Sequence, residues 1–310
     1  MDQRELADSA VAWLTQLGAQ PPPGSRFDRA LRALHSLPLG ERLADRDDRT
    51  TQTQIHTTQD LLEIEFIRTS RLVEDSDTPT QRCLVDRLRQ ATRDADVPNA
   101  DRSPGRDAQK ELFAAAAFHY AGFRPVTLAE PDIVCHWGNS PLSIAVKNAR
   151  GRGNFDRLMS RACDQVRASK REGVVWCDIA RLISAPGDLY RPIADGIPAD
   201  AHQREEVRQF LREHVQRLTS HANTKSVLLF VFMSSRIVLD AGVLRLESYR
   251  LHVDVPRNDI YAQHRSALLQ QAMSRMFITI KPERWTADGQ LAAMTPLEWP
   301  SKLALDRIDY

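Results

Sequence analysis

The stretch EPDIVCHWGNSPLSIAVKN, from Glu130 to Asn148, decides the fold. Two strand-like runs rich in β-branched and aromatic residues flank the sequence GNSP, which is typical of a hairpin turn. A symmetric four-residue turn would pair the runs so that Asp132 faces Lys147, with Cβ atoms about 5 Å apart. The sequence therefore predicts a carboxylate and an ammonium that face each other across adjacent strands.

The sequence around this hairpin alternates between helical and strand patterns. An alanine-rich helical run precedes the hairpin and ends before Gly122, a residue typical of helix C-termini. The order of elements predicts a mixed α/β core. The expected helices are Arg106–Tyr120, Phe155–Lys170 and Gln203–Ser220; the expected strands are Arg124–Leu128, Asp132–Trp137, Leu142–Asn148, Val174–Ile179, Val227–Met233 and Val243–Val255.

The first hundred residues are polar and helical in pattern, and none of their side chains has catalytic spacing. We expect residues 1–100 to form an accessory region for packing, substrate gripping, or assembly into a homodimer or larger oligomer. The turn-rich stretch Asp94–Gly105 then leads into an α/β domain of residues 101–310. The expected helices are Arg4–Leu17, Arg29–Leu37, Thr58–Val73 and Thr80–Arg93, with a loop over Leu43–Thr58.

The composition limits the class of protein. Of the 310 residues 42% are hydrophobic, which is enough for a sizeable core, and 42 basic residues against 41 acidic ones exclude a polycation. The four cysteines have no CxxC or zinc-type spacing, which favours a reduced compartment. The sequence has no signal peptide pattern and no apolar run of about 20 residues. We therefore expect a cytoplasmic protein without a membrane partner.

The run from Arg106 to Ile179 resembles the PD-(D/E)XK nuclease superfamily. The shared pattern is a helix with a glutamate, a strand that opens with Pro-Asp, a strand with Ile-x-x-Lys and a helix that bears a glutamine. The resemblance implies a restriction-endonuclease-like mixed sheet flanked by helices. It also implies a nuclease that uses Mg²⁺ or Mn²⁺ to hydrolyse phosphodiester bonds, in DNA more than in RNA, for phage defence, restriction or repair.

The resemblance assigns roles to individual residues. Asp132, Glu111 and the carbonyl group of Val146 would bind the metal ion. Lys147 would position the attacking water, and Gln165 would hold the nucleophile or the phosphate. Asp132, Lys147, Glu111 and Gln165 together are the predicted catalytic set.

The sequence departs from the superfamily pattern at Ala145, where the second motif acid is expected two residues before the lysine. Three explanations stay open. Another acid has taken its place, with Glu111, Glu130, Asp156 and Asp164 as candidates. Alternatively, the chain is a catalytically inactive nucleic-acid-binding or assembly subunit, or a working glutamate has been replaced to trap an inactive form. An α/β interaction protein unrelated to nucleases is a further alternative.

Basic residues cluster directly after the motif. The loop NARGRGN carries Arg150 and Arg152 between glycines, and such loops can approach a phosphodiester backbone closely. Arg157 and Arg161 follow one helical turn apart. We expect these four arginines to bind nucleic acid, the loop pair above all.

Overall fold

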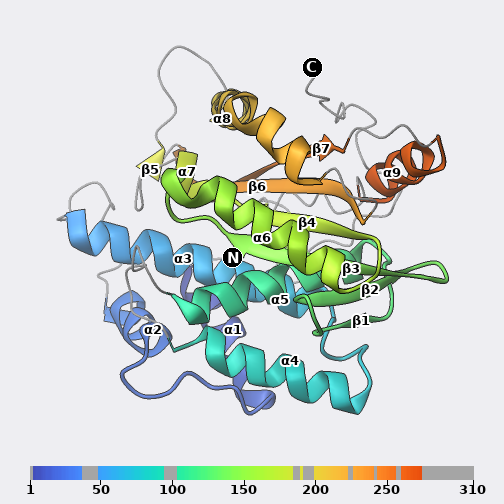
Figure 1. The fold of residues 1–310 in the computed structure, drawn as a ribbon. Helices are drawn as coiled ribbons and strands as arrows, with labels where there is room; N and C mark the ends of the chain where they lie inside the picture. The colour runs from blue at the N-terminus through green and yellow to red at the C-terminus, as the bar shows by residue number, and fades with distance from the viewer. Residues whose placement is uncertain are drawn as a thin grey trace.

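The protein is described by a computed structural model that covers residues 3–36, 48–93, 103–183, 189–190, 199–222, 226–240, 243–255 and 260–273. These residues form the expected mixed α/β architecture (Figure 1). The helices are α1 Gln3–Gln16, α2 Arg26–Ser36, α3 Asp48–Thr69, α4 Thr78–Ala91, α5 Pro104–Tyr120, α6 Phe155–Ala168, α7 Ala180–Ile183, α8 Ala199–Ala222 and α9 Ile260–Met273. The strands are β1 Val126–Thr127, β2 Ile133–Trp137, β3 Ser140–Asn148, β4 Gly173–Asp178, β5 Leu189–Tyr190, β6 Val227–Asp240 and β7 Val243–Asp254.

One mixed sheet joins the strands in the order β1-β2-β3-β4-β6-β5, with β7 paired to β6. Strands β1, β2 and β3 form an antiparallel meander, whereas β3, β4 and β6 are parallel. The crossover from β3 to β4 runs through α6, and α8 precedes β6. The carboxyl ends of three strands therefore meet at one edge of the sheet, next to the start of β2.

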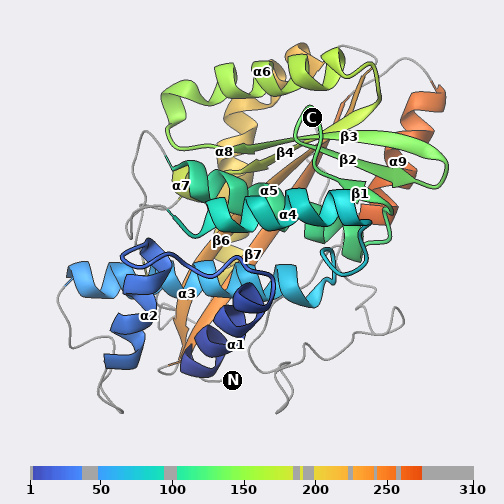
Figure 2. The ribbon, with the colours of Figure 1, turned by 90° about the horizontal axis from the view of Figure 1, so that it is seen from below.

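The sheet separates two apolar layers (Figure 2). Successive side chains of a strand point to opposite faces. Ile144 and Val146 of β3 pack on the side of α5, and Ala145 between them packs on the side of α6 and α8. Both faces of the central strands are buried, which explains their nearly continuous apolar sequence.

The N-terminal helices belong to the same apolar layer as α5. Their buried side chains, including Leu14, Ile64 and Leu84, form one cluster with Phe113 and with the sheet. The rings of Phe66 on α3 and Phe113 on α5 lie 4.8 Å apart between centroids. Helix α5 is therefore covered by the sheet on one side and by α3 and α4 on the other.

Two expectations from the sequence were wrong in detail. The hairpin turn has two residues rather than four, because Gly138 adopts φ 59° and lets Trp137 pair with Ser140. The register is thus shifted by two residues, an even number that keeps every side chain on its expected face. In addition, part of the expected loop 43–58 is helical, since α3 begins at Asp48.

The cysteines are all free. Burial raises the pKa of the thiols of Cys135, Cys163 and Cys177, whereas Cys83 on α4 is exposed.

Strand β4 lies tight against β3 at Gly173. A Cβ atom at this position would lie 2.2 Å from the carbonyl oxygen of Ser143 and 2.8 Å from the side chain of Val166. We predict that Gly173→Ala lowers the free energy of unfolding by about 3 kcal/mol in urea titrations, because backbone must move to admit the methyl group. Gly153→Ala is the control, since its Cβ would meet no atom of the described part of the chain within 4 Å. Equal free energies of unfolding for the two variants would contradict the close approach of β4 to β3 at Gly173.

Candidate functional site

Asp132 lies at the end of the β2–β3 ladder. The last paired residues are Ile133 and Ile144, so the backbone N–H of Val146 lies beyond the ladder. The Asp132 carboxylate accepts a hydrogen bond from this N–H at 2.7 Å. The side chain thus continues the strand pairing and is fixed at the edge of the sheet.

Lys147 shares the same carboxylate oxygen. Its ammonium nitrogen Nζ lies 2.8 Å from Oδ2 of Asp132 and donates a second bond, also of 2.8 Å, to the carbonyl oxygen of Val146. The side chains of Asp132 and Lys147 are 16% and 14% exposed, so the pair is partly desolvated yet reachable. The expected acid–lysine pair is therefore present, although the strand register differs.

Glu111 on α5 completes the group. Burial and the negative charge of Asp132 raise the pKa of its carboxyl to about 7, against the lowering effects of Arg87 and Lys147. Arg87 on α4 lies 3.1 Å from Glu111 Oε2. The charge of Asp132 thus acts on Glu111, and a carboxyl with a pKa of about 7 can exchange a proton near neutral pH.

Gln165 and Ala145 lie apart from this group. Gln165 is on α6, which packs on the other face of the sheet from α5. Its Oε1 is buried and has no hydrogen-bond partner among the residues that the structure describes. Ala145 is fully buried in the apolar layer under α6. The structure brings together Asp132, Lys147, Val146 and Glu111, and it places Gln165 elsewhere.

The predicted nucleic-acid-binding arginines fall into two pairs. Arg150 forms an ion pair with Asp107 and donates to the carbonyl of Ser103 at 3.2 Å. Arg152 donates to the carbonyl of Leu182 at 3.1 Å and lies over the ring of Phe210. Arg150 and Arg152 thus hold their loop against the start of α5 and the end of α7. Arg157 and Arg161 are exposed on α6, as Arg152 is in the loop, and Arg157 donates to the side-chain oxygen of Asn154 at 2.9 Å.

Three other acids were considered as substitutes for the missing motif acid. Asp156 binds His214 and Arg217 of α8, Asp164 binds Arg167, and Glu130 is exposed in the turn before β2. Lys147 contacts Asp132 instead. Within the described ranges, no three His, Cys, Asp or Glu side chains are grouped so that they could hold a metal ion by themselves.

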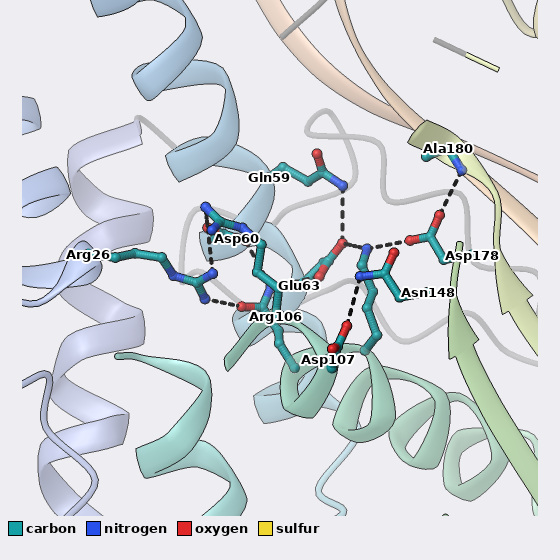
Figure 3. A network of polar contacts seen from close by, with 11 residues as sticks. Arg26, Gln59, Asp60, Glu63, Arg106, Asp107, Asn148, Asp178 and Ala180 are labelled. Atoms are coloured by element: carbon teal, nitrogen blue, oxygen red, sulfur yellow. Dashed lines mark hydrogen bonds and ion pairs between the residues drawn. The ribbon is translucent and has the colours of Figure 1, made fainter. Parts of the chain in front are cut away.

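A second polar cluster, which the sequence analysis missed, lies where α3 and α5 meet the carboxyl end of β4 (Figure 3). Lys110 on α5 is clamped between Glu63 of α3 and Asp178 at the end of β4, and the Asp178 contact measures 2.8 Å. Asp60 of α3 forms ion pairs with Arg106 at 3.3 Å and with Arg26 at 3.4 Å. The five residues that α3, α5 and β4 contribute to this cluster are all buried: Asp60, Glu63, Arg106, Lys110 and Asp178.

Opposite charges balance this buried cluster. Burial alone would lower the pKa of Lys110, but Asp178 and Glu63 outweigh it and raise the pKa. Burial likewise opposes ionisation of Asp60, but Arg26 and Arg106 hold the pKa of its carboxyl below the ordinary value. The pKa of His56 falls to about 4, chiefly through burial, so this histidine is neutral at pH 7. The cluster thus ties α2 and α3 to the carboxyl edge of the sheet.

Asp107 ties α5 to the end of β3. It accepts a hydrogen bond from the side chain of Asn148 at 3.2 Å and pairs with Arg150. Asn148 directly follows Lys147, and Asp107 lies one helical turn before Glu111. One carboxylate therefore holds the helix with the glutamate against the strand with the lysine.

The sequence did contain a hint of the buried cluster. The run LLEIEF of α3 places Glu63 and Glu65 among large apolar residues, and such charges are buried only with partners. Glu65 has a local partner, Arg68, three residues further on. The partner of Glu63 could not be read from the sequence, because Lys110 lies 47 residues further along the chain.

Comparisons with known proteins do not assign the chain to a family. No protein-family model matches the sequence, and no curated protein matches it. A separate structural finding is that none of the described helices is both long and apolar enough to cross a membrane.

The raised pKa of Glu111 makes stability depend on pH. Between the ordinary pKa of 4.5 and the raised value of about 7, the folded protein binds a proton that the unfolded chain does not. Glu111 therefore destabilises the fold as pH rises through this window, by up to about 3 kcal/mol. We predict that Glu111→Gln gains stability relative to the parent between pH 5 and pH 8 in urea unfolding. If the unfolding free energies of variant and parent differed by the same amount at pH 5 and at pH 8, the Glu111 carboxyl would not have the raised pKa that burial gives it.

The buried cluster allows a second stability prediction. Lys110→Met leaves Glu63 and Asp178 without their shared cation, which should cost about 3–5 kcal/mol in the free energy of unfolding. Lys170→Met, at an exposed position, serves as the control and should stay within about 0.5 kcal/mol of the parent. A small loss for Lys110→Met would mean that the cluster does not hold α3 against the sheet.

Proposed function

We propose that the protein is a metal-dependent nuclease of the PD-(D/E)XK type that hydrolyses phosphodiester bonds, with DNA as the favoured substrate. The observation that carries the proposal is the contact of 2.8 Å between Lys147 and Asp132 on adjacent strands. Glu111 on α5 is near enough for the charges of both residues to shift its pKa. The order of elements from α5 through the β1–β3 meander and α6 to β4 supports a restriction-endonuclease-like core.

The residues at this site suit Mg²⁺ or Mn²⁺ if other ligands complete the shell. Mg²⁺ is commonly held by one or two carboxylates, with waters and substrate phosphates in the remaining positions. Asp132, Glu111 and the Val146 carbonyl would hold the ion. Two of these groups already bind a cation, the Lys147 ammonium, which indicates that their oxygens converge. A bound metal ion supplies charge neutralisation at the phosphate and a more acidic water.

The side chains of Lys147 and Glu111 would stabilise developing charge and transfer protons. Lys147 carries three N–H donors on a flexible stem, so it can turn from Asp132 towards an oxygen that gains negative charge. Glu111, with a pKa of about 7, can take up or release a proton at neutral pH. Asp107 and Asn148 keep the two residues at a fixed separation.

The test uses the full chain with supercoiled plasmid, single-stranded DNA and RNA, each with Mg²⁺, Mn²⁺ or EDTA. We predict metal-dependent cutting that falls by about 100-fold or more in Lys147→Ala, because a group that stabilises the transition state is lost. Lys170→Ala, an exposed lysine after α6, should cut like the parent. Cutting that survives Lys147→Ala, or that persists in EDTA, would refute this assignment of the site.

A second candidate function is a nucleic-acid-binding or assembly subunit that does not cut. The full burial of Ala145 among apolar side chains favours it, because the strand then offers no carboxylate beside the lysine. Binding without cutting by the parent would support this candidate. Cutting that appears only in Ala145→Glu would identify a nuclease site disabled at this one position.

A further inference from the structure

We infer that duplex DNA binds along the exposed face of α6, through its phosphate backbone, rather than at the arginine loop that precedes the helix. The inference rests on the proposed function only for the class of ligand, nucleic acid.

The outer face of α6 is basic and open. Arg157 and Arg161 are exposed and lie one turn apart, so they point in nearly the same direction from the helix. The opposite face, with Phe155, Met159 and Val166, is buried against the sheet and α8. Figure 2 shows α6 at one margin of the molecule, with the sheet between it and α5.

The acids of α6 do not cancel this charge. Asp156 turns towards α8, where it binds His214 at 3.0 Å and Arg217 at 2.6 Å. Asp164 lies near the basic pair by helical spacing, but Arg167 neutralises it at 2.7 Å. The face therefore keeps the positive charge of Arg157 and Arg161, which suits a polyanion.

The place of α6 in the fold connects this face with the acid–lysine site. Strand β3 carries Lys147 near its carboxyl end, and α6 starts shortly afterwards at Phe155. Arg157 thus lies near the sheet edge that carries Lys147, and Arg161 lies one turn further along α6. A backbone that follows the two arginines is led towards the site.

The chemistry of the face favours a duplex. Proteins that bind single strands usually stack the bases on exposed aromatic side chains. The one aromatic residue of α6, Phe155, is fully buried. Arginines that contact only phosphates bind duplex DNA with little regard to sequence.

The experiment measures binding in EDTA, so that it does not depend on cutting. We predict that Arg157→Ala/Arg161→Ala weakens the binding of a 20-base-pair duplex about tenfold. It should also reduce the slope of log Kd against log salt by about 2, one for each lost phosphate contact. Arg32→Ala is the matched control, since Arg32 is an arginine of α2 whose side chain is 68% exposed.

The opposite change should strengthen binding. Asp164→Asn removes an acid whose side chain is 60% exposed and releases Arg167, so we expect a severalfold lower Kd. Circular dichroism checks that each variant is folded.

Two results would overturn the inference: a salt slope that is unchanged in the double variant, or an equal loss in Arg32→Ala. Tighter binding of single-stranded DNA or RNA than of the duplex would also overturn the choice of ligand. Binding that depends on α6 without any cutting would leave this inference intact and refute the nuclease proposal.

Discussion

The close approach of β4 to β3 at Gly173 sets the register on which both polar clusters depend. With Ser143 opposite Gly173, the parallel ladder places Lys147 opposite Cys177 and Asn148 opposite Asp178. The two strands therefore end at the same level, and their last residues, Asn148 and Asp178, both contact side chains of α5. Only glycine allows the approach, because a side chain there would collide with the backbone of β3.

The two clusters differ in how far their charged side chains are removed from water. In the buried cluster each carboxylate lies against a cation, and the side chains are almost removed from water. Such ion pairs contribute little net stability, but a missing partner is costly, so they fix one arrangement of the helices. At the sheet edge each acid also has a cation, Lys147 for Asp132 and Arg87 for Glu111. There, however, the side chains of both acids are 16% exposed, and the negative charge of Asp132 acts on Glu111. The first arrangement suits a structural role, and the second leaves protons and cations able to exchange.

The sequence predicted the order of elements and the acid–lysine pair, because both follow from local periodicity and from strand alternation. It did not predict the register, since a two-residue turn at Gly138 depends on a backbone angle that glycine permits but does not require. The sequence also suggested that the loop arginines reach outwards. Their partners, Asp107 and the carbonyl of Leu182, lie 43 and 30 residues away in the chain. Contacts over such separations form only once helices and strands have packed.

The distribution of cysteines offers a way to observe the site directly. Three thiols are buried and hard to ionise, so a maleimide reagent would attach at Cys83 on α4. Cys83 lies one helical turn before Arg87, the residue that contacts Glu111. A fluorophore or spin label at this position would sit on α4, one turn from the residue that contacts Glu111, and its spectrum would report the arrival of ions and ligands without any change of sequence.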